Sequence, residues 1–154
     1  MTERDELALE NHRLLQEVNL QAADADRQVL QQFGLSPARY FALSHIAERG
    51  ELTASDLCVL MLCDKANVTR LLDGLQQEGL VLRTRDTVDG RRTCVTLTEA
   101  GRVRWAAAHE AHRASVRQRL APLSAEEQTK LNALLLEVKT GLTHYLTGLA
   151  SDHP

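Results

Sequence analysis

The sequence predicts a mostly helical chain with one small two-stranded β-hairpin, and three patterns in its 154 residues support this fold class. First, apolar residues recur at three- and four-residue steps over most of the chain, which is the pattern of amphipathic helices. Second, a stretch rich in Thr, Val and Leu from residue 80 to 97 is interrupted by a polar turn, which is typical of a hairpin. Third, capping residues divide the helical part into six helices.

The first two helices are expected over residues 4–32 and from residue 37 to 49. Gly34 ends the first, since glycine is common just after a helix. Ser36 and Pro37 start the second, because Ser suits an N-cap and Pro the first helical position. One face of the first helix is apolar and carries Leu7, Leu14, Leu15, Val18, Ala22, Ala25 and Val29.

A third and a fourth helix follow in close succession. Thr53 caps the third, and Asp56 three residues later completes a capping box. Asp64 caps the fourth after a short break, and Gly79 ends it.

Two strands are then expected over residues 80–85 and 92–97, joined by a turn around Gly90. A fifth helix opens at Thr98 and reaches about residue 120. Pro122 breaks it, and a capping box of Ser124 with Glu127 starts a sixth helix that reaches about residue 149. Helix, turn, helix and hairpin in this order predict a winged helix-turn-helix.

The helical ends of the chain, residues 1–35 and 105–154, are long for a monomer of this size. Their apolar stripes must be buried against something, and the lobe of residues 36–104 is too small to cover them. We therefore expect dimerisation helices through which two chains intertwine. The alternative is a monomeric six-helix fold.

Composition and charge narrow the function. No apolar run approaches the roughly 20 residues that span a membrane, and the polar, acidic N-terminus favours the cytoplasm. No phosphate-binding glycine loop, nucleophile elbow or Cys–His spacing indicates an enzyme, and no cofactor or metal is expected. Aromatics at 3% argue against single-stranded nucleic acid. The net charge is −3, yet residues 64–104 carry +2, which is compatible with duplex DNA.

The fourth helix has a candidate DNA-reading face. With Val68, Leu71, Leu72 and Leu75 set against the core, a rotation of about 100° per residue turns the opposite side outward. Arg70 suits guanine and Asn67 suits adenine, while methyl groups suit thymine and a lysine in the first turn suits phosphate. The predicted contacts are Lys65, Ala66, Asn67, Thr69 and Arg70. Alternatively, Lys65 and Arg70 are ordinary solvated charges, with Arg70 paired to Asp73.

The hairpin adds basic side chains beside that helix. Arg91 at its tip could enter a narrow minor groove, and the carboxylates Asp86 and Asp89 could hold the hairpin in one shape by pairing with arginines. The predicted contacts here are Arg85, Asp89, Arg91 and Arg92, and Arg83 belongs to the same basic group. The alternative is a solvated, charged turn.

These motifs resemble those of MarR-type transcription factors. The likeness rests on Leu52-Thr53-Ala54-Ser55-Asp56-Leu57, Asn67-Val68-Thr69-Arg70-Leu71-Leu72-Asp73, Glu78-Gly79-Leu80-Val81, Arg85-Asp86-Thr87-Val88-Asp89-Gly90-Arg91-Arg92 and Leu97-Thr98-Glu99-Ala100-Gly101. Leu62-Cys63-Asp64 departs from the common pattern. The resemblance implies a homodimer on a pseudopalindromic promoter, usually a repressor, released by a small, often aromatic or phenolic effector or by thiol oxidation. It also implies DNA contacts at Asn67, Thr69 and Arg70 and a wing pair of Asp89 with Arg91.

The resemblance also places effectors in a cleft beside the dimer helices, for which His12, Tyr40 and His45 are the candidates. Each of the three could equally be a packing or surface residue. A metal site at His109 and His112 is a further alternative, although a solvated or interface pair is commoner.

Two rival functions remain open. A thiol-redox regulator would use Cys94, which we expect to be the more exposed cysteine, beside Arg92, while Cys58 is expected to be buried. A winged-helix module that binds protein and reads no bases is the second rival.

Overall fold

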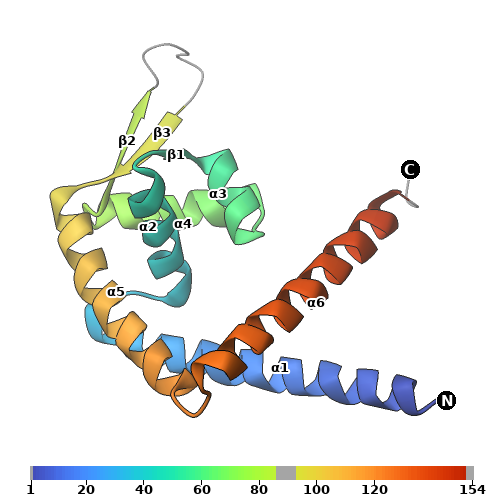
Figure 1. Ribbon diagram of the computed structural model, residues 1–154. Coiled ribbons are helices and arrows are strands. Elements are labelled where there is room, and N and C mark those ends of the chain that lie inside the picture. Colours follow the sequence, from blue (N-terminus) through green and yellow to red (C-terminus); the bar gives the residue numbers. More distant parts are fainter. Residues whose placement is uncertain (1, 86–92, 152–154) are drawn as a thin grey trace. The chain divides into compact units, whose positions relative to one another are not determined.

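The computed structural model describes residues 2–85 and 93–151. Figure 1 shows their elements in chain order, which are α1 (Glu3–Leu30), the 3-10 turn η1 (Gln31–Phe33), α2 (Pro37–Arg49), β1 (Leu52–Thr53), α3 (Ala54–Met61), α4 (Lys65–Gln77), β2 (Val81–Arg85), β3 (Thr93–Leu97), α5 (Glu99–Leu120) and α6 (Ala125–Ser151). The chain forms two compact units, one up to Arg113 and one from Ala114. The expected fold class, mostly helical with a small sheet, is confirmed.

The helix boundaries follow the expected capping residues closely. The Ser36 side chain accepts from the Arg39 amide, with Pro37 in the first turn of α2. Thr53 and Asp56 form the capping box of α3. A second capping box, Ser124 with Glu127, precedes α6 and holds the pKa of the Glu127 carboxyl below its usual value through the Ser124 backbone and hydroxyl. Local hydrogen bonds therefore define most of the secondary structure.

The sheet has one strand more than the sequence predicts. β1 pairs antiparallel with β3, which places Leu52 opposite Val95 and Thr53 opposite Cys94. The strand order is β1-β3-β2, so β3 is the central strand. A strand of two residues carries no alternating pattern, which is why only two strands were expected.

The position of β3 corrects the expectation for the cysteines. Cys94 is only 6% exposed, because its strand lies between two others, so the prediction that it is the accessible thiol is wrong. Cys58 is half-buried, whereas Cys63, at the break before α4, is exposed.

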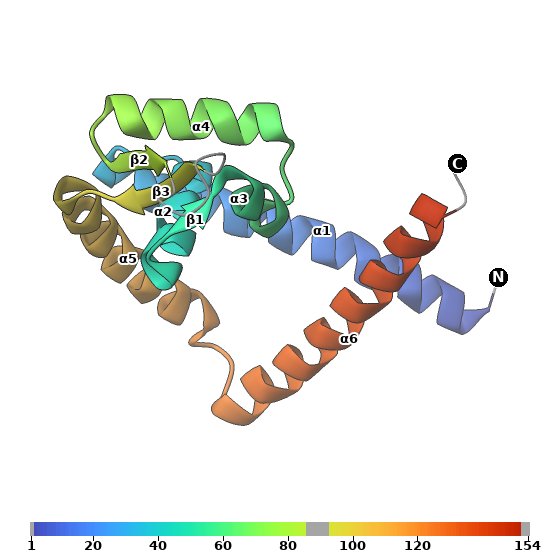
Figure 2. The same ribbon diagram turned by 90° about the horizontal axis from the view of Figure 1, so that it is seen from above.

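One hydrophobic core joins α2, α3, α4 and the sheet. Its fully buried side chains include Leu30, Leu43, Ile46, Leu57, Val68, Leu72, Leu75, Leu80, Val81 and Val95. Seen from above, α4 runs along the outer edge of this lobe, with β2, α3 and α2 on its inner side (Figure 2). Only the outer face of α4 is therefore left for a ligand.

α6 forms most of the second unit and has a different character. Its described side chains from residue 125 to 150 are all exposed, including a series of leucines. Among the described residues, none of the helices is long and apolar enough to cross a membrane.

Candidate nucleic-acid interface

The outer face of α4 carries the five side chains expected to contact DNA. Val68, Leu72 and Leu75 are at most 1% exposed and face the core, and Leu71 is half-buried. The opposite side presents exposed Lys65, Ala66, Asn67, Thr69 and Arg70. The expected orientation of this helix is thus the observed one, and the DNA-binding roles of the five residues stay predictions.

Three of the exposed residues of α4 and its cap form a chain of hydrogen bonds. Asp64 caps the helix by accepting from the Asn67 backbone amide (2.9 Å), and its other oxygen accepts from Asn67 Nδ2 (2.5 Å). Asn67 Oδ1 then accepts from Arg70 Nη2 (2.7 Å). This Asp64–Asn67–Arg70 relay holds the Arg70 guanidinium on the N-terminal half of the exposed face, the half that enters a major groove.

Asp73 does not pair with Arg70, contrary to the alternative interpretation. Arg83 of β2 pairs with Asp73 (Nη1 to Oδ1, 2.7 Å), and its Nη2 donates to the backbone oxygen of Thr69 (3.3 Å). Arg70 is paired to Asn67 instead. The Arg83 side chain therefore braces the wing against α4, a role the sequence did not indicate.

The hydroxyl of Thr69 is engaged in a hydrogen bond within α4. Its Oγ1 donates to the backbone oxygen of Lys65 (2.8 Å), which is a common arrangement for Thr within a helix. The methyl group is left as the part of the side chain that suits contact with a thymine methyl.

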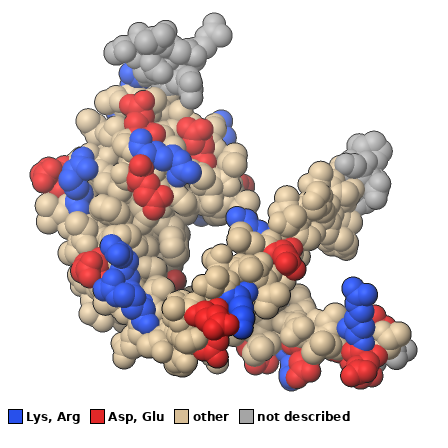
Figure 3. Space-filling view, viewed as in Figure 1, with Lys and Arg blue, Asp and Glu red and all other residues tan. Residues whose placement is uncertain are grey.

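The wing is described only at its base. Arg85 is exposed and lies opposite Thr93, at the end of the β2–β3 pairing. Asp89, Arg91 and Arg92, together with Asp86, lie outside the described residues. Figure 3 shows basic and acidic side chains interspersed over the face drawn.

A polar aromatic cluster lies where α1, α2 and α5 meet. The hydroxyl of Tyr40, a residue only 3% exposed, bonds Nδ1 of His109 (2.9 Å) and Nδ1 of His112 (3.2 Å). His112 Nε2 reaches Asp26 (3.1 Å), and Trp105 stacks on His109 with ring centres 4.9 Å apart. The cluster therefore links α2 to α5 through the Tyr40 hydroxyl and α5 to α1 through His112.

Burial of the Tyr40 ring raises the pKa of its phenol. The Ser44 hydroxyl opposes this effect, while the negative charges of Asp26 and Glu48 add to it. The phenol is therefore a proton donor in this cluster at ordinary pH.

The three predicted effector residues are not joined by any contact that the structure records. Tyr40 belongs to the cluster, and His12 is exposed on α1. His45, five residues and about 140° from Tyr40 on α2, is half-buried, and its Nδ1 has no hydrogen-bond partner among the described residues.

Two further observations bear on ligands. A hollow of about 700 Å³ opens beside Phe33, Val103 and Arg104, and none of the three predicted effector residues lines it. The part of the chain that the structure describes holds no group of three His, Cys, Asp or Glu side chains suited to a metal. His109 and His112, considered as a metal pair, flank Tyr40 instead.

Comparison with known proteins identifies the family. Residues 33–92, which include the helix-turn-helix, match the MarR family model. The HTH-type transcriptional regulator YdgJ of Bacillus subtilis (strain 168) is 32% identical over 111 residues, which are 72% of this chain and 68% of YdgJ. The chain belongs to the MarR family. Its function is accordingly that of a DNA-binding transcriptional regulator.

Solved structures agree with this MarR-family fold. AbsC, a MarR family transcriptional regulator from Streptomyces coelicolor, is 26% identical with a TM-score of 0.81, and the match covers 94% of this chain and 97% of AbsC. A mutant of MarR from E. coli, complexed with operator DNA, has a TM-score of 0.78 at 24% identity, covering 90% of this chain and 99% of MarR. The second likeness shows the fold alone.

Proposed function

We propose that this MarR-family chain acts as a homodimer that binds a pseudopalindromic operator in duplex DNA and represses transcription until a small effector releases it. The observation that carries this proposal is the Asp64–Asn67–Arg70 relay on the exposed face of α4. The operator complex of E. coli MarR, which shares the fold, supports it. The protein would act in the cytoplasm, where its operator lies.

Arg70 is the principal base-reading residue in this proposal. The guanidinium has five donors and gives one to Asn67, so two others can bind O6 and N7 of one guanine. Both ends of the Asn67 amide are engaged, so we infer that Asn67 first orients Arg70. The second hydrogen of Nδ2 and the second lone pair of Oδ1 remain for adenine.

The other predicted DNA contacts would bind phosphate, thymine methyl groups or the minor groove, according to their side chains. Lys65 and the first backbone amides of α4 suit a phosphate, and Ala66 with the Thr69 methyl suits thymine. Arg85, Arg91 and Arg92 would reach the minor groove and backbone beside the half-site. Asp89 would hold the wing arginines by an ion pair within the wing.

Homodimer formation rests on the exposed apolar side chains of α6 and α1. A stripe at alternating four- and three-residue steps along α6, the α6 stripe, is 37–66% exposed and consists of Leu131, Leu135, Val138, Leu142, Tyr145 and Leu149. Apolar exposure on this scale marks a protein interface. With residues 1–35 and 105–154 as dimerisation helices around the lobe of residues 36–104, two α4 helices would lie about 34 Å apart, one turn of DNA.

Release by an effector is proposed near the polar aromatic cluster. Tyr40 shows that a phenolic hydroxyl fits between His109 and His112, so an aromatic or phenolic effector could compete for the same nitrogens. The unpartnered Nδ1 of His45 offers a second polar atom. His12 lies on the same helix as Asp26 but about 21 Å along it, so we propose it only as a more distant contact of the effector cleft. A thiol-redox trigger at Cys94 is less well supported, because that thiol is buried.

Selection of bound duplexes from a random pool tests this proposal, followed by titration of the selected operator at several salt concentrations. A palindromic consensus with half-sites about ten base pairs apart is expected, and log affinity should fall linearly with log salt. Arg70→Ala should weaken binding by about 10- to 100-fold and relax preference at one base, whereas Gln76→Ala on the same helix should not. Binding without salt dependence or sequence preference would favour a protein-interaction module.

A further inference from the structure

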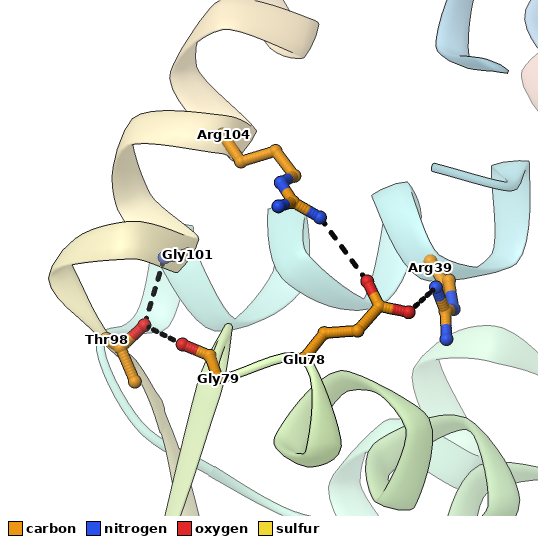
Figure 4. A network of polar contacts seen from close by, with 6 residues as sticks. All are labelled: Arg39, Glu78, Gly79, Thr98, Gly101 and Arg104. Carbon is orange, nitrogen blue, oxygen red and sulfur yellow. Dashed lines mark hydrogen bonds and ion pairs between the residues drawn. The ribbon is translucent and has the colours of Figure 1, made fainter. Parts of the chain in front are cut away.

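One acidic side chain joins the end of α4 to two other helices. Glu78, the C-cap of α4, accepts from Arg39 of α2 through Oε1 (2.5 Å) and from Arg104 of α5 through Oε2 (3.3 Å) (Figure 4). These partners lie 39 and 26 residues away in the sequence. All three belong to the first compact unit.

The same end of α4 is also held through the backbone. Thr98 Oγ1 donates to the Gly79 oxygen (2.6 Å) and accepts from the Gly101 amide (3.0 Å), as Figure 4 shows. The Thr98 amide donates to the Leu80 oxygen (3.1 Å). The first turn of α5 is therefore fastened to the residues that follow α4.

The other end of α4 is held differently. Leu62, in the break before it, has a left-handed backbone (φ 51°) and a side chain that is 94% exposed. The predicted base-reading residues lie on this end. A helix of 13 residues is about 20 Å long, so a tilt of roughly 10° about the Glu78 end would move Asn67 by about 3 Å and Arg70 by about 2 Å.

We propose that Glu78 is a positioning residue that fixes the angle of α4 against α2 and α5, and thereby the half-site spacing that the dimer accepts. This inference rests on the proposed function. The Arg39, Glu78 and Arg104 side chains are 25%, 38% and 40% exposed, and ion pairs at such exposure contribute little to stability. Their geometry is more informative. Arg39 of α2 and Arg104 of α5 bind different oxygens of the Glu78 carboxylate, so a rotation of α4 toward or away from either helix would stretch one of the two ion pairs.

The test measures affinity of the full-length dimer for the selected operator and for duplexes with one base pair added or removed between the half-sites. Wild type should prefer one spacing by about tenfold or more. Glu78→Gln should lose about 3- to 10-fold at the preferred spacing and little at the others, with an unchanged melting temperature. Glu78→Asp, which keeps the charge, should recover part of the preference.

Two further variants separate positioning from general destabilisation. Gly74→Ala keeps every charge, yet the new Cβ would lie 2.8 Å from Arg39 Nη2, so the arginine must move and the spacing preference should weaken. Arg102→Gln removes an exposed ion pair confined to α5 (Arg102 Nε to Glu99, 3.7 Å) and should leave the preference unchanged.

The outcomes separate the two proposals. Equal loss at all spacings with Glu78→Gln, or no loss, overturns the positioning role alone. Wild-type protein that binds none of the duplexes contradicts the proposed function as well.

Discussion

α4 and α6 are both amphipathic helices, but they satisfy their side chains in opposite ways. α4 buries Val68, Leu72 and Leu75 inside its own lobe, while on its polar side Arg70 bonds Asn67 and Asp73 pairs with Arg83. α6 leaves its apolar residues exposed along its whole length. The comparison teaches that the exposed face of α4 is held in place by contacts within one chain, whereas the apolar side chains of α6 find no such contacts among the described residues.

The difference is visible in how the apolar residues are distributed. The 13 residues of α4 carry one narrow apolar side, which suffices for packing against α3, β2 and α2. The 27 residues of α6 carry the α6 stripe, which Leu134 and Leu146 widen at its two edges, and Leu136 lies on another side. An exposed apolar face of this width has more surface to bury than the narrow apolar side of α4.

Substitution within the α6 stripe is expected to have the largest effect. Burial of one Leu side chain contributes about 1.5–3 kcal/mol, so the double variant Leu135→Glu with Leu142→Glu should raise the dimer dissociation constant by at least about 100-fold. Sedimentation equilibrium would measure this change, and operator affinity should fall with it. Ala133→Glu with Thr140→Glu, on the opposite side of α6, is the control. An unchanged dimer in the first variant would show that α6 is not the interface.

A glycine-to-alanine change should have opposite effects in the lobe that carries α4 and in α6. A Cβ on Gly101 would lie 1.9 Å from the Leu80 backbone oxygen, so Gly101→Ala should destabilise the lobe by about 3 kcal/mol, at the upper end of overpacking effects. A Cβ on Gly141 of α6 meets nothing within 4 Å, and Gly141→Ala should be neutral or stabilising by up to about 1 kcal/mol. Urea unfolding measures both, and equal effects would contradict the comparison.

Local features of this fold could be predicted from the sequence, and long-range ones could not. Ser36, Thr53 and Asp64 were identifiable as caps because their partners lie three residues away. β1 was missed because it exists only through pairing with a strand some 40 residues later. The burial of Cys94 was missed for the same reason, because β1 pairs with the strand that carries it.

The candidate site also has local features that could be predicted and long-range contacts that could not. The outward face of α4 follows from helical periodicity, so Asn67 and Arg70 could be placed without a structure. The contacts of Arg83 with Asp73, and of Tyr40 with two histidines 69 and 72 residues away, depend on how elements pack. No pattern within one helix encodes them.

Removal of the Arg83–Asp73 ion pair between β2 and α4 should have a smaller effect, on operator affinity. Arg83→Ala would free Asp73 to compete with Asn67 for Arg70, three residues away on α4, so operator affinity should fall by about tenfold. Asp73→Ala in the same chain should restore part of that loss, because the competing carboxylate is gone. A double-mutant cycle on operator affinity measures the coupling, and strictly additive losses would contradict the brace.

Tyr40→Phe should have a modest effect near neutral pH and a distinctive pH dependence. Loss of the hydroxyl leaves two histidine nitrogens without their partner, which costs about 1–3 kcal/mol of unfolding free energy. Because the folded pKa of Tyr40 lies above its ordinary value of 10.0, the folded chain keeps this proton when the unfolded chain loses it. The stabilisation is therefore complete below pH 10 and declines as pH rises through the folded pKa.

Wild type and Tyr40→Phe should accordingly converge in stability above pH 10, as measured by urea unfolding at a series of pH values. Tyr145→Phe, which removes a phenol from the α6 stripe and leaves this cluster intact, is the control for the loss of a tyrosine hydroxyl. A constant difference between wild type and Tyr40→Phe from pH 7 to 11 would mean that the phenol ionises as readily in the folded chain as in the unfolded one. The cluster would then be a packing contact between α1, α2 and α5, and its hydroxyl would contribute no proton-linked stability to the lobe that carries α4.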